Sequence, residues 1–179
     1  MTRLPTLVVV SGPPGAGKTT LAHAIARAVG CPAICRDEIK EGMVHAAPGF
    51  EAGPGDALSR RTLPTFFGVL HLLVNAGVTV VAEAAFQDRL WRPGLAPFHG
   101  LARIRIVHCL VDADVAYSRR LRRWEDDPLR RAHESTRPKD AAARHDAFDR
   151  ISVDAPGIEV DTTDGYTPGL DKIVAFVNG

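Results

Sequence analysis

Apolar positions along the chain form two kinds of pattern, short continuous runs and longer stretches with helical spacing. Five runs rich in Val, Ile and Leu predict buried strands at residues 6–10, 32–35, 78–82, 102–111 and 158–161. Between them, apolar residues three or four positions apart predict helices at 21–29, 37–41, 56–75, 88–99, 114–125, 139–149 and 170–177. We expect Pro64 to kink the third helix, and Pro93 and Pro97 to interrupt the fourth. This alternation predicts a doubly wound, mainly parallel sheet in a single α/β domain over residues 1–179.

A glycine-rich segment joins the first predicted strand to the first predicted helix. It reads Gly12-Pro13-Pro14-Gly15-Ala16-Gly17-Lys18-Thr19-Thr20. Up to Thr19 it fits the Walker A spacing, and the strand-to-helix context is the one in which that motif binds phosphate. Glycines allow successive N–H groups to converge on phosphates at a helix N-terminus, and because Pro13 and Pro14 have no N–H, we expect the donors to begin at Gly15. Lys18 would add a point charge between the β- and γ-phosphates, and the Thr19 hydroxyl could ligate Mg²⁺.

Charged side chains follow the second and third predicted strands. Arg36 and Asp37 come after the strand at 32–35, and Glu83 follows the strand at 78–82. Open α/β sheets bind ligands at the carboxyl ends of their strands, so we expect these side chains near the phosphate site. Asp37 is our candidate for the base that takes a proton from an acceptor hydroxyl, and Glu83 for the acidic group near the metal. Arg36 could hold an anionic group of the acceptor.

Plainer interpretations of these carboxylates stay open. Asp37 could only cap the helix that follows it, in which case Glu38 is the alternative base. Glu83 could be an ordinary carboxylate at the end of a strand.

Arginines gather in the helix predicted at 114–125 and in the exposed segment after it. Arg119 and Arg123 fall on one face of that helix. Because a guanidinium can stack on adenine and bind phosphate through two hydrogen bonds, Arg119 is a candidate nucleotide ligand, and Arg123 and Arg130 are candidates for stabilising the transferring phosphate. Other arginines of this region are expected to form a solvated surface.

The segment at residues 45–55 is rich in Gly, Pro and Ala and predicts a mobile loop. In a small enzyme such a loop often covers a substrate. Arg60, which follows the loop, could meet a charged substrate, although an exposed helix surface is the plainer interpretation.

Composition narrows the range of partners. A formal net charge of +1 gives no whole-molecule field to attract nucleic acid or a membrane, and no apolar run approaches a membrane span. The three cysteines are too few and too irregularly spaced for a disulfide framework or a zinc site, and the seven histidines show no metal-binding spacing. We therefore expect reduced core thiols in a cytoplasmic protein. The sequence leaves open whether the chain is a monomer or a homodimer.

Three segments of the chain resemble the P-loop kinases of the AAA_33 type. They are Gly15-Ala16-Gly17-Lys18-Thr19-Thr20-Leu21-Ala22, Arg36-Asp37-Glu38-Ile39 and Val80-Val81-Ala82-Glu83-Ala84-Ala85-Phe86. This group includes polynucleotide 5′-hydroxyl kinases and is similar to chloramphenicol phosphotransferase and zeta-toxin kinases. The resemblance implies a P-loop NTPase fold with a five-stranded parallel sheet of nucleoside-monophosphate-kinase type. It also implies that Asp37 is the base and that an arginine-rich lid, at about residues 125–138, closes over ATP; where this chain has Glu83, relatives commonly carry Asp.

These observations together predict an ATP- and Mg²⁺-dependent phosphotransferase. Its acceptor would be a hydroxyl of a small molecule, either a nucleoside-like compound or an antibiotic, the latter implying a role in antibiotic resistance. Two alternatives stay open: a polynucleotide 5′-hydroxyl kinase, and a regulatory or toxin-like module that hydrolyses ATP without a small acceptor. The acceptor itself and the choice between ATP and GTP are not readable from the sequence.

Overall fold

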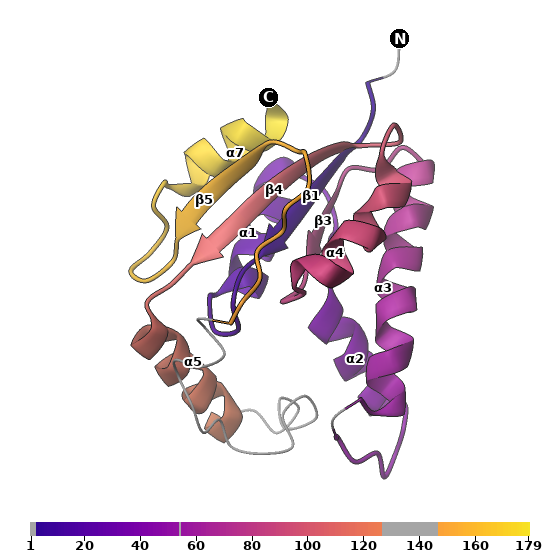
Figure 1. Ribbon diagram of the computed structural model, residues 1–179, viewed down its shortest axis with the longest axis vertical. Coiled ribbons are helices and arrows are strands. Elements are labelled where there is room, and N and C mark those ends of the chain that lie inside the picture. The colour runs from indigo at the N-terminus through magenta and orange to yellow at the C-terminus, as the bar shows by residue number, and fades with distance from the viewer. Residues whose placement is uncertain (1–2, 54, 127–146) are drawn as a thin grey trace.

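The computed structural model describes residues 3–53, 55–126 and 147–179. Within these ranges, five strands form one sheet: β1 (Thr6–Ser11), β2 (Ala33–Cys35), β3 (Val80–Glu83), β4 (Arg103–Leu110) and β5 (Gly157–Asp161). Their order is β2-β3-β1-β4-β5, and each neighbouring pair is parallel. The predicted five-stranded parallel sheet is therefore confirmed, and the strand that leads into the glycine-rich segment lies at its centre (Figure 1).

Helices cover both faces of the sheet. On one face lie α1 (Lys18–Val29) and α7 (Leu170–Asn178), and on the other lie α3 (Ala57–Asn75) and α4 (Asp88–Leu95) (Figure 1). Successive residues of β1 alternate between these faces, so that Leu7 and Val9 pack against α3 and α4 while Val8 and Val10 pack against α1 and α7. All four side chains are fully buried, which explains why this strand has a continuous apolar sequence.

The remaining helices lie where the carboxyl ends of the strands meet. β2 passes directly into α2 (Arg36–His45), and β4 is followed by α5 (Ala113–Asp126). In Figure 1 these two helices and the loop between β1 and α1 occupy the lower edge of the sheet, whereas both termini lie at the upper edge. The lower edge is the one at which open α/β sheets bind their ligands.

An aromatic cluster holds α3 and α4 against the end of β3. Phe66 and Phe67 of α3, Phe86 after β3 and Trp91 of α4 pack with ring centroids 5.2 to 6.1 Å apart, mostly edge to face. Phe66 and Trp91 are fully buried, and burial of each contributes about 1.5–3 kcal/mol to the stability of the fold. Because Phe86 is close in sequence to Glu83, the cluster also fixes the strand end that carries this carboxylate.

The structure differs from the sequence-based expectations at several local points. The expectation that Asp37 caps its helix is wrong: α2 begins at Arg36 with Cys35 in the cap position, because β2 runs into the helix without a linker. Pro64 and Pro93 both lie inside helices, and the fourth helix changes only at Ala96, into the short 3₁₀ helix η1 (Ala96–Phe98).

The expected helix at 139–149 falls mostly on residues outside the described ranges, and residues 147–149 are not helical. In the described parts of the chain, no helix combines the length and the apolar character that crossing a membrane requires.

Candidate active site

The glycine-rich loop between β1 and α1 fits tightly against its neighbours. Gly12 and Gly15 have positive φ angles of 154° and 89°, and a Cβ atom at either position would overlap backbone atoms of Cys109 in β4 or Ala116 in α5. Gly17 caps α1 in the left-handed conformation, with φ 65°. The glycines therefore allow both the curvature of the loop and its close approach to β4 and α5.

Lys18, the first residue of α1, follows this loop and has only 6% of its surface exposed. Its Nζ donates a hydrogen bond of 2.9 Å to the carbonyl of Pro13, and the Ala16 amide donates to the same carbonyl at 3.2 Å. A neutral carbonyl does not balance the charge of a buried ammonium, and it uses only one of the three ammonium protons. The lysine thus suits an anionic ligand such as a triphosphate, which the positive end of α1 also favours.

Thr19 and Glu83, the two candidate metal ligands, are in contact with each other. The Thr19 Oγ1 donates to Glu83 Oε2 at 3.0 Å, and Glu83 is 4% exposed. The contact follows from the sheet, since pairing of β1 with β3 sets Glu83 opposite Val10, the second-last residue before the loop. A hydroxyl and a carboxylate are hard oxygen donors that suit Mg²⁺, so these two side chains fit the predicted metal site.

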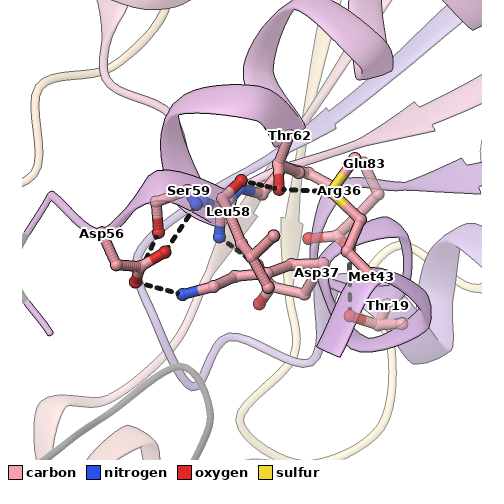
Figure 2. Close-up of polar contacts among 10 residues, drawn as sticks. Thr19, Arg36, Asp37, Met43, Asp56, Leu58, Ser59, Thr62 and Glu83 are labelled. Atoms are coloured by element: carbon pink, nitrogen blue, oxygen red, sulfur yellow. Dashed lines mark hydrogen bonds and ion pairs between the residues drawn. The ribbon is translucent and has the colours of Figure 1, made fainter. Parts of the chain in front are cut away.

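Arg36 and Asp37 lie beside this pair, at the junction of β2 and α2. In the sheet, Cys35 is the partner of Glu83, which brings the start of α2 next to the end of β3. Arg36 Nη1 donates to Asp37 Oδ1 at 3.0 Å, and 39% of the Asp37 side chain remains exposed. Figure 2 shows both side chains near Thr19 and Glu83. Asp37, the predicted base, is thus accessible to solvent and is held by the guanidinium of Arg36. Arg36 in turn uses one of its hydrogen-bond donors on Asp37.

A buried ion pair connects α2 to the start of α3. Lys40 Nζ lies 2.8 Å from Asp56 Oδ2, and the two side chains are 3% and 8% exposed. Asp56 also caps α3, because its Oδ1 accepts a hydrogen bond of 2.7 Å from the Ser59 amide. Burial raises the pKa of the Asp56 carboxyl, but hydrogen bonds from Lys40 and Ser59 outweigh this effect and lower it to about 2. The ammonium of Lys40 additionally lies 5.8 Å from the ring centre of Phe50, which belongs to the loop over residues 46–56.

Sequence reasoning missed this pair. The available signal was Asp56 directly before an apolar helical pattern, which is typical of an N-cap, but nothing in the sequence indicated its buried partner. Arg60, the candidate substrate ligand, is exposed at the start of α3, and its Nη1 donates to the carbonyl of Gly55 at 2.7 Å. This position agrees with the plainer interpretation of Arg60 as helix surface.

A cavity of about 420 Å³ lies on the other side of the glycine-rich loop. It is lined by Gly17, Thr20, Arg119, Arg122, Arg123, Thr162, Gly165 and Tyr166. The Arg119 guanidinium is fixed by hydrogen bonds of 2.7 Å and 3.1 Å to the carbonyls of Thr162 and Thr163, and Arg123 Nε lies 3.3 Å from the Arg119 carbonyl. The cavity is therefore lined both by the predicted nucleotide ligands Thr20 and Arg119 and by the loop that follows β5.

That loop was not singled out from the sequence. Thr162 is 3% exposed, and its hydroxyl lies 3.0 Å from the carbonyls of both Ala16 and Leu110, so it connects the glycine-rich loop to β4 across a long stretch of chain. Arg130 and most of the expected lid at residues 125–138 lie outside the described residues.

Comparison with solved structures identifies kinases of similar fold. A protein from Chloroflexus aurantiacus, named only provisionally as a kinase, has a TM-score of 0.83 and 21% identity, with 98% of each chain covered. APS kinase from Mycobacterium tuberculosis, solved in complex with AMPPNP and APS, has a TM-score of 0.66 and 14% identity, with 99% of this chain and 100% of that chain covered. A gluconokinase from Sinorhizobium meliloti has a TM-score of 0.62 and 18% identity, with 99% and 94% covered. At these identities the likeness establishes the fold.

No curated protein matches the sequence. The AAA_33 family model, described as an AAA domain, matches residues 7–148, which include β1 except Thr6, the glycine-rich loop, Asp37, Glu83 and Arg119. The chain therefore belongs to the AAA_33 family.

Proposed function

We propose that this protein is an ATP- and Mg²⁺-dependent kinase that transfers the γ-phosphate of ATP to a hydroxyl of a small molecule. The observation that carries the proposal is the hydrogen bond between Thr19 and Glu83 beside Asp37. This contact brings together two side chains suited to a metal ion, and they lie near a candidate base and next to the loop proposed to bind phosphate. This combination suits phosphoryl transfer, which depends on positioning and charge stabilisation more than on covalent chemistry.

Each residue of the site has a proposed role. The amides from Gly15 to Thr20 and the ammonium of Lys18 hold the phosphates, and the cavity beside Arg119 takes the nucleoside. Thr19 and Glu83 hold Mg²⁺, which when bound neutralises charge on the phosphates. Arg123 and Arg130 are proposed to stabilise the charge of the transferring group.

Asp37 would act on the acceptor. As the acceptor oxygen bonds to the γ-phosphorus and the bond to the ADP oxygen breaks, the Asp37 carboxylate accepts the hydroxyl proton. Arg36 keeps this carboxylate in place through the contact at 3.0 Å. A carboxylate that is 39% exposed can receive an acceptor from solvent, whereas Glu83 at 4% exposure cannot.

A small acceptor, such as a nucleoside-like compound or an antibiotic, is the class that we propose. The neighbours named as a gluconokinase and an APS kinase, which are covered over 94% and 100% of their length, support this class. A chain of an RNA repair complex is also similar in fold, but only 44% of it is covered. The net charge of +1 supports it as well, because it provides no general attraction for a nucleic-acid backbone.

The test is a mass-spectrometric screen for the mass gain of one phosphate, over pooled nucleosides, antibiotics, sugars and 5′-hydroxyl oligonucleotides, with wild type and Asp37→Asn. We expect one small acceptor class to be phosphorylated by wild type and not by Asp37→Asn, with ATP affinity nearly unchanged in the variant. Phosphorylation of oligonucleotides alone, with affinity that falls steeply with salt, would replace this proposal by the polynucleotide kinase. ATP hydrolysis without any phosphorylated acceptor would replace it by the regulatory or toxin-like module.

A further inference from the structure

Three side chains of different chemistry converge next to the proposed magnesium pair. His23 of α1, Cys35 at the end of β2 and Glu38 of α2 offer a nitrogen, a sulfur and an oxygen donor, and these donor atoms all lie within 4.8 Å of one another. His23 Nε2 lies 2.7 Å from Glu38 Oε1 and 3.8 Å from Cys35 Sγ. We refer to these three residues as the His–Cys–Glu cluster.

The fold brings the cluster together through rigid elements. His23 lies one turn after Thr19 on the same face of α1. Cys35 pairs with Glu83 in the sheet, and Glu38 lies in the first turn of α2, directly after β2. The donors therefore come from a helix, a strand end and a second helix that the sheet already fixes, which limits the rearrangement that a ligand would require.

The cluster is shaped as a shallow open site. Cys35 is 1% exposed and forms its floor, whereas the side chains of His23 and Glu38 are 44% and 42% exposed and form its rim. An ion would reach the thiol when these two rim side chains, now 2.7 Å apart, separate.

The distances suit a tetrahedral ion bound by nitrogen, sulfur and oxygen. Bond lengths of about 2.0–2.3 Å to these donors place neighbouring donor atoms about 3.3–3.7 Å apart. The separation of His23 Nε2 and Cys35 Sγ, 3.8 Å, is already close to this value. The Glu38 oxygen lies within 4.8 Å of the Cys35 sulfur. The 2.7 Å contact of His23 with Glu38 must lengthen, and rotation of the half-exposed Glu38 side chain allows that.

The charges around the thiol favour a cation. The carboxylates of Glu83 and Glu38 both lie close enough to Cys35 to act on its thiol. Their two negative charges would stabilise a divalent ion, and because such an ion binds the sulfur as a thiolate, the thiol proton would leave to solvent. Imidazole and thiolate donors select zinc-like ions, whereas the oxygen donors of Thr19 and Glu83 suit Mg²⁺, so the two positions differ in the ions they prefer.

We propose that the His–Cys–Glu cluster is a binding site for a divalent transition-metal ion of the zinc class, with water in the fourth position. Such an ion would connect α1, β2 and α2 at the junction that carries Asp37. The proposal is independent of the kinase activity, because its test requires neither ATP nor an acceptor.

Cobalt is the probe for the test, since a cobalt–thiolate bond has its own ultraviolet absorption and tetrahedral cobalt absorbs strongly in the visible range. We expect chelator-treated full-length protein to bind one Co²⁺ with both features, Zn²⁺ to displace it, and excess Mg²⁺ to leave it bound. Cys35→Ser should abolish the thiolate absorption, and His23→Gln and Glu38→Gln should each weaken cobalt binding by at least about tenfold. Cys31→Ser and His71→Gln, which alter a cysteine and a histidine outside the cluster, should have no effect.

Thermal unfolding of each variant without metal shows whether it folds. His23 and Glu38 are half-exposed, so their variants should keep the fold even if Cys35→Ser does not. The proposal is overturned if folded wild type gives no thiolate absorption with cobalt, or if His23→Gln and Glu38→Gln bind cobalt as tightly as wild type does.

Discussion

The buried pair of Lys40 and Asp56 offers a quantitative test of how α2, and with it Asp37, is positioned. The substitution Asp56→Asn keeps a side chain that can cap α3 and accept from the Ser59 amide, but it removes the negative charge. Lys40, which is 2% exposed, would then be a buried ammonium without its carboxylate. Loss of one partner of a buried ion pair typically costs about 3–5 kcal/mol.

The pKa of Asp56 gives a second estimate of the free energy that this ion pair contributes to stability. The shift from 3.8 to about 2 corresponds to about 2 kcal/mol. Since asparagine can still accept a hydrogen bond from Lys40, we expect a loss of about 3 kcal/mol, between the two estimates, and a fall in Tm of about 6–12 °C for a chain of this size.

The sign of the pH dependence follows from the direction of the shift. Because the carboxyl has a lower pKa in the folded state, its contribution to stability is complete above about pH 4 and disappears as the pH falls towards 2. Wild type should therefore lose more stability than Asp56→Asn over this interval.

Chemical denaturation at neutral pH and thermal unfolding between pH 2 and 5 measure these effects. The double variant Lys40→Met with Asp56→Asn should recover much of the lost stability, since it leaves no unpaired charge. Asp171→Asn, at an exposed position in the first turn of α7, is the matched control and should cost less than about 1 kcal/mol. A cost below about 1 kcal/mol for Asp56→Asn as well would show that the pair behaves as a surface ion pair, and would refute this reasoning.

Three further substitutions test other parts of the site. Glu83→Gln keeps an oxygen for Thr19 but removes the charge, so the Mg²⁺ concentration for half-maximal activity should rise at least about tenfold; an unchanged requirement would remove Glu83 from the metal site. Gly15→Ala forces a side chain onto the Ala116 backbone at φ 89° and should destabilise by more than about 1 kcal/mol, whereas Gly68→Ala, in open space on α3, should be neutral or stabilising in the same denaturation assay. Arg119→Ala removes part of the lining of the cavity that is proposed to hold the nucleoside and should raise the Kd for ATP at least about tenfold; equal affinity would place the adenine elsewhere.

The layers of the fold were predictable because the strands have distinctive sequences. Both faces of the sheet are covered, so β1 and β3 are continuous apolar runs that stand out from the helices around them. The apolar runs also indicated where the candidate site lies. A charged residue directly after such a run, such as Glu83, has to lie at the edge of the sheet where ligands bind. Its contact with Thr19 then follows from the parallel pairing of β1 with β3.

Contacts between distant segments were not predictable in the same way. Lys40 and Asp56 are ordinary polar positions in the sequence, and only the packing of α2 on α3 makes them a buried pair. Thr162 reaches the carbonyl of Ala16 across 146 positions, because β5 ends beside the glycine-rich loop. The error in the cap of α2 has a local cause, since an apolar run gives no sign that a strand continues into a helix without a linker.

The His–Cys–Glu cluster was missed for a related reason. Its donors come from three elements, so they match none of the short metal-binding spacings by which such sites are recognised in a sequence. Their convergence depends on the pairing of β2 with β3 and on the position of α1 beside them.

The kinase activity requires that the loop amides and Lys18 hold a triphosphate whose terminal phosphate can be transferred. Titration calorimetry with ATP in the presence of Mg²⁺ measures this binding. We expect folded wild type to bind one ATP per chain and Lys18→Met, which removes the buried ammonium, to bind it at least about tenfold more weakly. Absence of ATP binding by folded wild type, or equal affinity in Lys18→Met, would show that the loop is not a triphosphate site.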